Sequence, residues 1–222
     1  MISIVIPVYN SEKNISNLVN NIIKIFKEFN FEIILVNDNS QDSSHEVCVK
    51  VSEEHSSIIN YLKLSKNVGE HNAVMAGLKF AEGDWILIMD DDFQTTPEEG
   101  LKLVKYAINN NYLVVYGSYK SKKHNFFRNL GSKINDLTAN LILRKPKNLY
   151  LNSFKCISQK LVKEISKYEG PYAYVDGLIL TNTTNVGVLE IEHKERKDGK
   201  SQYSYLKLLK LYFNIATNFS FP

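Results

Sequence analysis

This chain of 222 residues has few cysteines, and its positive and negative charges nearly balance. Its two cysteines, Cys48 and Cys156, do not form a Cys-x-x-Cys pair, which argues against a zinc site. Free, buried thiols in a reducing compartment are expected instead. The 27 basic residues nearly balance the 24 acidic ones and leave a formal net charge of +3. The overall charge therefore gives no indication of a nucleic-acid partner, and any electrostatic signal must be local.

Long apolar runs are also absent from the sequence. No stretch reaches the roughly 20 apolar residues that a membrane-spanning helix needs. The N-terminal segment 1–10 has no basic region before its apolar residues and meets Pro7 at once. This pattern predicts a first strand and not a signal peptide. We expect the chain as given to be soluble or peripheral to a membrane.

The first half of the chain alternates β-rich runs with segments of helical periodicity. This alternation predicts an α/β fold in which helices cover both faces of a mainly parallel sheet, giving three layers. A content of 44% hydrophobic residues suffices for one large domain. The expected strands are 2–8, 32–36, 61–64, 85–89 and 113–117, and the expected helices are 15–29, a segment ending near residue 54, and 70–81.

Polar clusters follow three of these expected strands. They are Pro7-Val8-Tyr9-Asn10, Asn37-Asp38-Asn39-Ser40 and Asp90-Asp91-Asp92. In an open parallel sheet, ligands bind at the carboxyl ends of the strands. The sequence therefore predicts a single site at the sheet edge where the three clusters converge.

Consecutive carboxylates at the end of an apolar strand indicate a cation site. Asp90, Asp91 and Asp92 would repel one another and lose hydration unless a cation compensates for their charge. On an extended backbone Asp90 and Asp92 share one side with Gln94, whereas Asp91 points away. Hard oxygen ligands of this kind suit Mg²⁺ or Mn²⁺. The alternative is a solvated turn that caps the following helix through residues 96–98, and the two roles are compatible.

The segment 119–133 is rich in basic residues and contains no acid. Its basic residues are Lys120, Lys122, Lys123, Arg128 and Lys133. A stripe of apolar residues at helical spacing begins within it and comprises Phe126, Phe127, Leu130, Ile134, Leu137 and Leu141. A basic helix with such a stripe suits a membrane surface, and an ordinary amphipathic helix packed on the domain explains the pattern as well.

Four ordered motifs between residues 5 and 99 resemble those of the family 2 glycosyltransferases, which have the GT-A fold. The motifs are PVYNSEKN, VNDNSQD, KNVGEHNAVMAGL and DDDFQTTPEE. The resemblance implies a Rossmann-like three-layer sandwich. It also implies an inverting glycosyltransferase of the hexosyltransferase type that uses a nucleoside-diphosphate sugar, with Mg²⁺ or Mn²⁺ as its cofactor.

Later segments resemble the polyprenyl-phosphate branch of that family, which includes dolichyl-phosphate mannosyltransferase and the undecaprenyl-phosphate sugar transferases. These segments are NSFKCISQKLV, YVDGLI and VLEIEHKERKDGKSQYSYLKLLKL. In that branch the motif RxxGxSxY closes the catalytic domain, and transmembrane helices often follow. We therefore expect a catalytic domain over 1–202, a juxtamembrane helical segment over 203–222, and membrane-spanning helices beyond it. Within the domain, 1–99 would bind the nucleotide and 100–202, with the amphipathic segment 121–143, would bind the acceptor.

The resemblance also implies roles for individual residues. The nucleotide would contact Pro7, Tyr9, Asn10, Asp38, Ser40, Lys66, Asp90 and Asp91, with Asp38 accepting from the base edge. The metal would be held by Asp90, Asp92 and Gln94. The acceptor or its phosphate would contact Arg128, Ser132, Ser153, Lys155, Arg196, Lys200, Ser201 and Tyr203. The catalytic residues would be Asp90, Asp92 and Asp176.

Four positions depart from the family pattern. Ser11 replaces the usual glutamate after the first motif's asparagine, and Asn37 replaces the first aspartate of the second motif. Asn39 replaces a glycine, which is tolerable because asparagine adopts left-handed backbone better than most residues. Ser153 stands where some relatives carry an aspartate that could act as a base.

The missing base favours a phosphate as the acceptor. A phosphate monoester has a second pKa of about 6, so it is largely dianionic at neutral pH and needs little deprotonation. A sugar hydroxyl would need a base. Asp176 is the remaining candidate, with burial against a backbone partner as the alternative, and His71 is either a surface residue at a helix start or a catalytic one.

These features together predict transfer of a sugar from a UDP-, dTDP- or GDP-linked donor to a polyprenyl phosphate. The reaction would take place at the cytoplasmic side of the cell membrane, in cell-envelope glycan biosynthesis. Two alternatives stay open: transfer to a glycan hydroxyl in surface-polysaccharide assembly, and a sugar-nucleotide-binding scaffold without turnover. The identity of the sugar and the base, and the question of a homo-oligomer, also stay open.

The basic, apolar segment leads to a first prediction. Each basic residue near an anionic membrane contributes about 1 kcal/mol, so the chain should co-sediment with anionic vesicles and not with neutral ones. Replacing both Phe126 and Phe127 by aspartate should weaken that binding while the melting temperature stays unchanged. Absence of any enrichment on anionic vesicles at low salt would contradict the membrane interpretation.

Overall fold

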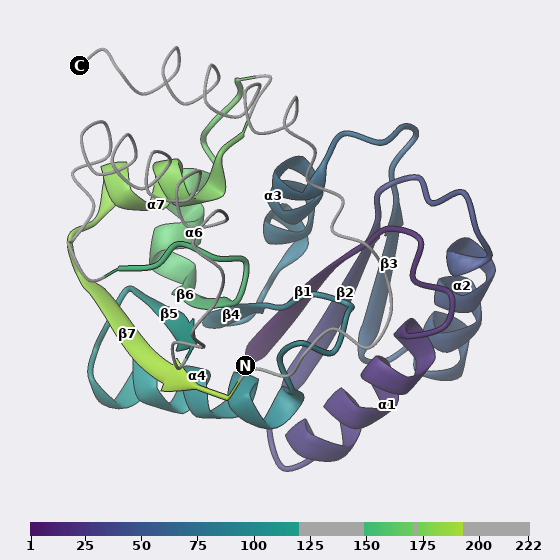
Figure 1. Ribbon diagram of the computed structural model, residues 1–222, viewed down its shortest axis with the longest axis horizontal. Coiled ribbons are helices and arrows are strands. Elements are labelled where there is room, and N and C mark those ends of the chain that lie inside the picture. Colours follow the sequence, from purple (N-terminus) through teal and green to yellow (C-terminus); the bar gives the residue numbers. More distant parts are fainter. Residues whose placement is uncertain (120–148, 171–172, 193–222) are drawn as a thin grey trace, which may run out of the picture.

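The computed structural model describes residues 1–119, 149–170 and 173–192 (Figure 1). A seven-stranded sheet lies between two layers of helices. The strands are β1 (Ile2–Val8), β2 (Phe31–Asn37), β3 (Ile59–Lys63), β4 (Trp85–Ile88), β5 (Val114–Tyr119), β6 (Lys155–Ser158) and β7 (Val186–Ile191). The helices are α1 (Ile15–Phe26), α2 (Ser44–Glu54), α3 (Glu70–Phe80), α4 (Pro97–Asn109), α6 (Gln159–Ile165) and α7 (Val175–Asn182). The expected three-layer α/β fold is confirmed.

The sheet has the strand order β3-β2-β1-β4-β6-β5-β7. β1 pairs in parallel with both β2 and β4, and β5 pairs in parallel with β7. Only β6 runs against its neighbours, since it is antiparallel to β4 and to β5. The sheet is therefore mainly parallel, as the alternation of the sequence predicts.

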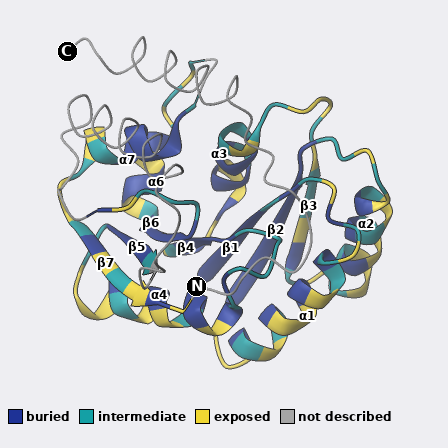
Figure 2. Cartoon of the chain, viewed as in Figure 1, coloured by how far each residue is buried: buried dark blue, intermediate teal, exposed yellow. Residues whose placement is uncertain are grey.

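Each face of the sheet buries its own apolar core. On one face, α1, α2 and α4 cover the sheet through side chains such as Leu18, Ile22 and Leu103, with α4 lying over β4 to β7. On the other face, α3, α6 and α7 contribute side chains such as Leu78 and Val162. β1 and β2 are buried along almost their whole length, as Figure 2 shows, because helices cover both of their faces.

The order in which strands are added to the sheet changes side between β1 and β4. From β1 the sheet grows through β2 to β3 on one side, whereas β4 lies on the other side of β1. Such a switch point leaves a crevice at the carboxyl ends of the two strands, where open α/β sheets bind ligands. The antiparallel β6 adds a further segment to this edge, because Lys155 at the start of β6 pairs with Ile88 at the end of β4.

Helix α3 packs unusually close to the sheet. A Cβ atom on Gly77 would lie 2.5 Å from Val5 Cγ1 and 3.0 Å from Val36 Cγ2. Only a glycine at this position lets the helix approach β1 and β2 so closely. The close packing fixes the N-terminal end of α3 beside the carboxyl ends of both strands.

Most of the expected elements in the first half are present, and their ends differ by a few residues. α1 ends at Phe26, earlier than the expected residue 29, and β3 begins at Ile59, earlier than the expected residue 61. Helix α4 begins as predicted, with Pro97 in its first turn and Thr96 Oγ1 accepting a hydrogen bond from Glu99 N at 3.4 Å. Among the described residues, no helix is long and apolar enough to cross a membrane.

A buried carboxylate connects several strands at the end of the sheet where the parallel strands begin, opposite to the polar clusters. Glu32 Oε1 accepts hydrogen bonds from Ser3 Oγ at 2.6 Å and from Glu82 N at 2.8 Å. Its other oxygen accepts one from Asn60 Nδ2 at 3.0 Å. Glu32 therefore joins β1, β2, β3 and the turn before β4, and its contacts compensate for the cost of burying a charge.

We predict that Glu32→Ala destabilises the fold by about 2–4 kcal/mol, because it leaves the buried hydroxyl of Ser3 and the part-buried donors of Asn60 and Glu82 without their acceptor. Urea denaturation followed by circular dichroism measures the loss. The control is Glu53→Ala, in which an exposed glutamate of α2 is removed, and its effect should stay within about 0.5 kcal/mol. Equal stability of the two variants would contradict the structural role of Glu32.

Candidate active site

Three turns at the carboxyl ends of the strands contain residues in left-handed backbone conformation. They are Asn10 (φ 55°) after β1, Asn39 (φ 55°) after β2 and Phe93 (φ 58°) after β4. The expectation that Asn39 takes the place of a glycine in this conformation is confirmed. Such residues reverse the chain sharply, so each turn stays close to the strand end that it follows.

Hydrogen bonds tie the turn after β1 to the turn after β2. Asn10 N donates to Ser40 Oγ at 3.0 Å, and Gln41 N donates to Asn10 Oδ1 at 2.8 Å. Ser11 N donates to Ser44 Oγ at 2.7 Å. The structure thus brings together Asn10 and Ser40, which the sequence places in the nucleotide site, and it uses them to hold two turns in one geometry.

Asp38 is buried and holds a third segment in place. Its carboxylate accepts hydrogen bonds from Val68 N at 2.7 Å and from Gly69 N at 2.9 Å, just before α3. Gly69 has φ +87°, a conformation that favours glycine. Desolvation by burial raises the pKa of Asp38, although the two backbone donors act against that shift. Contact of Asp38 with a nucleotide base stays a prediction.

Asp91 turns toward the end of β1. Its Oδ2 accepts a short hydrogen bond from Ser11 Oγ and another from Tyr9 N at 3.4 Å. Burial raises the pKa of Asp91 to about 7, and the neighbouring charge of Asp90 adds to that rise. Ser11, which replaces the family's glutamate, therefore serves as a donor to this carboxylate.

Asp90 turns toward the other side, where β6 begins. Ser153 Oγ donates a short hydrogen bond to Asp90 Oδ2. This contact follows from the topology, because the antiparallel β6 starts at the edge where β4 ends. The serine that stands in place of a carboxylate base is thus bonded to one of the proposed metal ligands.

Asp92 lies in the turn that leads into α4. Its Oδ1 accepts a hydrogen bond from Gln94 N at 3.0 Å, across Phe93. The backbone is therefore no longer extended here, and strict alternation of side chains ends with β4 at Ile88. Among the described residues, no three His, Cys, Asp or Glu side chains form a group that could hold a metal. The metal set of Asp90, Asp92 and Gln94 stays a prediction.

Asp176 and Lys155 form an ion pair in the interior. Their side chains are only 7% and 3% exposed, and Lys155 Nζ contacts Asp176 Oδ1 directly. Tyr116 Oη donates to the same oxygen at 2.9 Å, and the Lys155 ammonium lies 5.0 Å from the centre of the Tyr116 ring. The sequence assigns Asp176 to catalysis and Lys155 to the acceptor, and the structure pairs the two side chains with each other.

The first turn of α3 adds two titratable side chains that face this pair. The His71 ring meets the edge of the Tyr174 ring with 5.1 Å between centroids, and desolvation lowers the pKa of His71 to about 4. Glu70 is accessible to solvent, yet desolvation by the surrounding protein and the charge of Asp90 raise its pKa to about 7. No sequence pattern singled out Glu70, because an acid in a first helical turn is common wherever it complements the helix dipole.

Among the described residues, acidic side chains outnumber basic ones at this edge of the sheet. Asp90 and Asp92 act on Asp91, and Asp90 and the buried pair of Lys155 and Asp176 act on Glu70. Desolvation is the main cause of the raised pKa values of Glu70 and Asp91, and the neighbouring charge of Asp90 adds to both. A divalent cation would relieve this repulsion, and Mg²⁺ often binds to only one or two carboxylates together with substrate phosphates. The residues present therefore fit a metal whose coordination the substrate completes.

The remaining predicted site residues divide into two groups. Pro7 is half-buried at the end of β1, and Lys66 is exposed in the turn before α3. The others lie outside the described residues: Arg128, Ser132, Arg196, Lys200, Ser201 and Tyr203, together with the segments 121–143 and 203–222.

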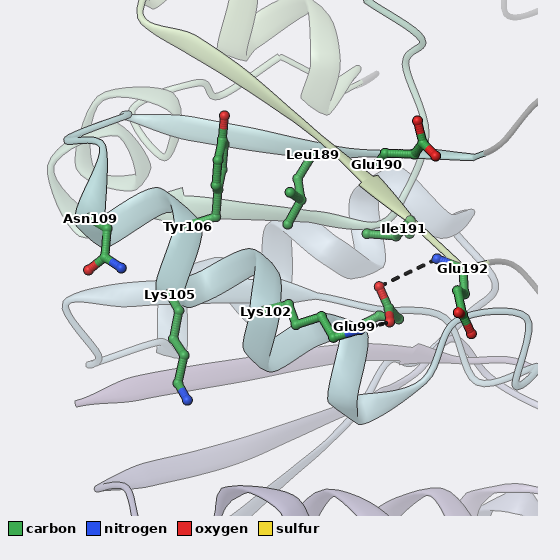
Figure 3. A pocket seen from close by; sticks show the side chains of 9 residues that line it. All are labelled: Glu99, Lys102, Lys105, Tyr106, Asn109, Leu189, Glu190, Ile191 and Glu192. Atoms are coloured by element: carbon green, nitrogen blue, oxygen red, sulfur yellow. Dashed lines mark hydrogen bonds and ion pairs between the residues drawn. The ribbon is translucent and has the colours of Figure 1, made fainter.

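A separate pocket of about 510 Å³ lies between α4 and the edge strand β7 (Figure 3). Lys102, Lys105 and Tyr106 line it from α4, and Leu189 lines it from β7. Buried Glu99 closes one end, where its Oε2 accepts a hydrogen bond from Glu192 N at 3.4 Å. None of the polar residues that converge at the switch point lines this pocket, so its size does not mark it as the active site.

Curated relatives align with nearly the whole chain. The undecaprenyl-phosphate 4-deoxy-4-formamido-L-arabinose transferase of Pectobacterium atrosepticum is 32% identical over 224 residues, which cover 97% of this chain and 66% of the relative. The protein of the same name from Salmonella choleraesuis is 29% identical over 222 residues, with the same coverage of both chains. The chain thus spans about two thirds of the length of these relatives.

Solved structures share the fold at low sequence identity. S. aureus TarS 1-349 in complex with UDP-GlcNAc has a TM-score of 0.64 and 19% identity, covering 100% of this chain and 68% of that chain. The glucosyl-3-phosphoglycerate synthase of Mycobacterium tuberculosis, in complex with Mn²⁺, UDP-glucose and phosphoglyceric acid, has a TM-score of 0.69 and 12% identity. That alignment covers 100% of this chain and 80% of the synthase. These likenesses confirm the expected GT-A-like fold.

The family model for glycosyl transferase family 2 matches residues 3–166, which include the turns after β1, β2 and β4 and both serines that donate to Asp90 and Asp91. Together with the relatives of about 30% identity, this match shows that the chain belongs to glycosyl transferase family 2.

Proposed function

We propose that this chain is the catalytic domain of an enzyme that transfers a sugar from a nucleoside diphosphate to a polyprenyl phosphate. The observation that carries the proposal is the convergence of Asp38 and Asp90–Asp92 on one switch point of the sheet. The relatives that align with 97% of the chain are named as undecaprenyl-phosphate sugar transferases, which favours a lipid phosphate as acceptor.

The donor would lie across the carboxyl ends of β1, β2 and β4. The base and ribose fit beside Asp38 and the turn after β1, where hydrogen bonds already fix the backbone. The diphosphate fits beside Asp90 and Asp92, which would hold Mg²⁺ or Mn²⁺ with Gln94. When bound, the cation would neutralise the charge of the departing diphosphate.

Neither of the two positions considered for a base on the acceptor side offers a free carboxylate. Ser153 donates to Asp90, and Asp176 is buried in an ion pair with Lys155. A phosphate acceptor tolerates this arrangement, because it is already ionised at neutral pH and needs no proton removed. The protein groups then mainly position and neutralise the reactants.

The acceptor also determines where the enzyme would act. A polyprenyl phosphate stays in the membrane, so the domain over residues 1–202 must reach the headgroup at the cytoplasmic surface. The basic segment 121–143 and the residues Arg196, Lys200, Ser201 and Tyr203 are proposed to contact the lipid phosphate or the membrane surface. Charge-assisted hydrogen bonds from arginine and lysine suit phosphate oxygens.

A labelled-sugar assay tests the acceptor class. The protein is incubated with Mn²⁺, a radiolabelled nucleoside-diphosphate sugar and membranes that contain polyprenyl phosphate, and the label is then partitioned between organic solvent and water. Label in a lipid product is the expected result. A water-soluble glycan product would point to a hydroxyl acceptor, and absence of any product would contradict an enzymatic role.

Asp92→Ala should lower the transfer rate by about 100-fold or more, because it removes a group that would help to stabilise charge on the leaving diphosphate. Calorimetry should show that the same variant loses Mn²⁺-dependent binding of the nucleoside diphosphate. Glu98→Ala, which removes an exposed acid from the first turn of α4, is the nearby control and should keep that binding. Unchanged metal-dependent affinity in Asp92→Ala would contradict the assignment.

Asp176→Asn should destabilise the fold by about 3–5 kcal/mol, because it leaves the buried Lys155 ammonium without its carboxylate. The double variant Asp176→Asn with Lys155→Met should recover part of that loss, since the unpaired charge is removed as well. Thermal denaturation of the single and double variants measures the coupling. A large loss of activity in Asp176→Asn at an unchanged melting temperature would instead support Asp176 as the base.

A further inference from the structure

We propose that Glu70 is a specificity residue whose carboxylate accepts hydrogen bonds from the sugar being transferred. The inference rests on the proposed function, because it takes the switch point to be the site for a nucleoside-diphosphate sugar. It adds a residue that the sequence motifs leave unassigned and names the chemistry that it would recognise: a hydroxyl or ammonium group on the sugar.

The position of Glu70 in the fold supports this role. It directly follows Gly69, whose backbone N–H is bonded to Asp38 on the side proposed for the base. The charges that act most strongly on Glu70 are Asp90, on the proposed metal side, and then Lys155 and Asp176. Glu70 therefore lies near the positions proposed for the nucleotide, the diphosphate and the acceptor. The transferred sugar must lie between the diphosphate and the acceptor, so Glu70 is placed to contact it.

The charge of Glu70 disfavours direct contact with the phosphate groups of the two substrates. A carboxylate repels the diphosphate of the donor and the phosphate of a lipid acceptor, and further carboxylates next to Glu70 strengthen that repulsion. A sugar carries several hydrogen-bond donors and no negative charge of its own. Carboxylates accept such hydrogen bonds well, because an ionised acceptor forms stronger bonds than a neutral one.

The other carboxylates of the site are engaged by protein groups. Asp38 accepts from two backbone amides, Asp90 from Ser153, and Asp91 from Ser11. Glu70, by contrast, is accessible to solvent and makes no hydrogen bond or ion pair with any residue that the structure describes. Its carboxylate is thus the one in this group that can turn to a ligand without breaking a contact of the fold.

The backbone beneath Glu70 is fixed, which is what discrimination between sugars needs. Asp38 holds the turn before it, Gly77 lets α3 pack tightly on β1 and β2, and His71 contacts Tyr174 edge to face at 5.1 Å. A rigid support lets a single acceptor distinguish sugars by the position of their donors. The side chain of Glu70 can still rotate, while its backbone stays in place.

The test compares binding of a donor with binding of its nucleotide alone. Calorimetry with Mn²⁺ gives the Kd of UDP-glucose, dTDP-glucose and GDP-mannose and of UDP, dTDP and GDP, and the pair that the wild-type protein binds most tightly is used. Glu70→Gln should leave the Kd of the nucleoside diphosphate unchanged. It should weaken binding of the sugar nucleotide by about 10- to 100-fold, the range for a lost hydrogen bond to a charged group.

Two further variants separate contact from charge and from stability. Glu70→Asp keeps the charge but draws the carboxylate back by one methylene group, so it should lose donor affinity as Glu70→Gln does. Glu53→Gln, which neutralises an exposed glutamate of α2, should change neither Kd. Melting temperatures close to that of the wild type confirm that each variant is folded.

The outcomes distinguish this inference from the proposed function. Equal weakening of the nucleoside diphosphate and the sugar nucleotide in Glu70→Gln would overturn the inference and make Glu70 a metal or nucleotide contact. Wild-type donor affinity in Glu70→Gln or in Glu70→Asp would overturn it as well, whereas label in the lipid product would still uphold the function. If the wild-type protein binds none of the six nucleotides, the inference and the proposed function both fail.

Discussion

Crowding of carboxylates at one edge of the sheet is the constraint on which the site depends. Parallel strands have their carboxyl ends at the same edge of the sheet, and here those ends carry Asp38 and Asp90–Asp92. In the part of the chain that the structure describes, the buried Lys155 pairs with Asp176 nearby. Repulsion of this kind raises pKa values and costs stability unless each carboxylate finds a donor or a cation. Serine hydroxyls and backbone amides supply the donors, and a divalent cation would supply the missing positive charge.

The serines that donate hydrogen bonds to the aspartates also join the two halves of the domain. Ser11 links the turn after β1 to Asp91, while Ser153 links the segment before β6 to Asp90. Consecutive aspartates therefore reach in opposite directions, Asp91 toward the turn after β1 and Asp90 toward the segment before β6. Because β6 runs antiparallel, it brings residues far along the chain to the edge where β4 ends. One reversed strand thus brings side chains from both halves of the chain to the same site.

Sequence patterns predicted the strands, the helices and the position of the polar clusters, because these depend on residues close together in the chain. Buried apolar runs and helical periodicity located β1 through α4, and the polar clusters located the edge. Alternation predicted that Asp91 points away from Asp90, and the two side chains do reach in opposite directions. It does not place Asp92 and Gln94, because β4 ends at Ile88 and Phe93 takes a left-handed conformation. The four-residue strand β6 and the surroundings of Glu70 depend on tertiary contacts, for which a single sequence has no local signal.

The departures from the family pattern follow the same electrostatic logic. Ser11, Asn37 and Ser153 each stand where the family or some of its members carry an acid, and each neutral side chain forms a hydrogen bond in its place. Asn37 is fully buried, donates to Tyr61 Oη at 2.9 Å and accepts from Ser40 N at 2.8 Å, so no charge is buried there. An edge that already gathers so many carboxylates gains from losing three more, and two of the replacements orient the aspartates that remain. The substitutions therefore preserve the geometry of a working site, which argues against a scaffold that has lost its activity.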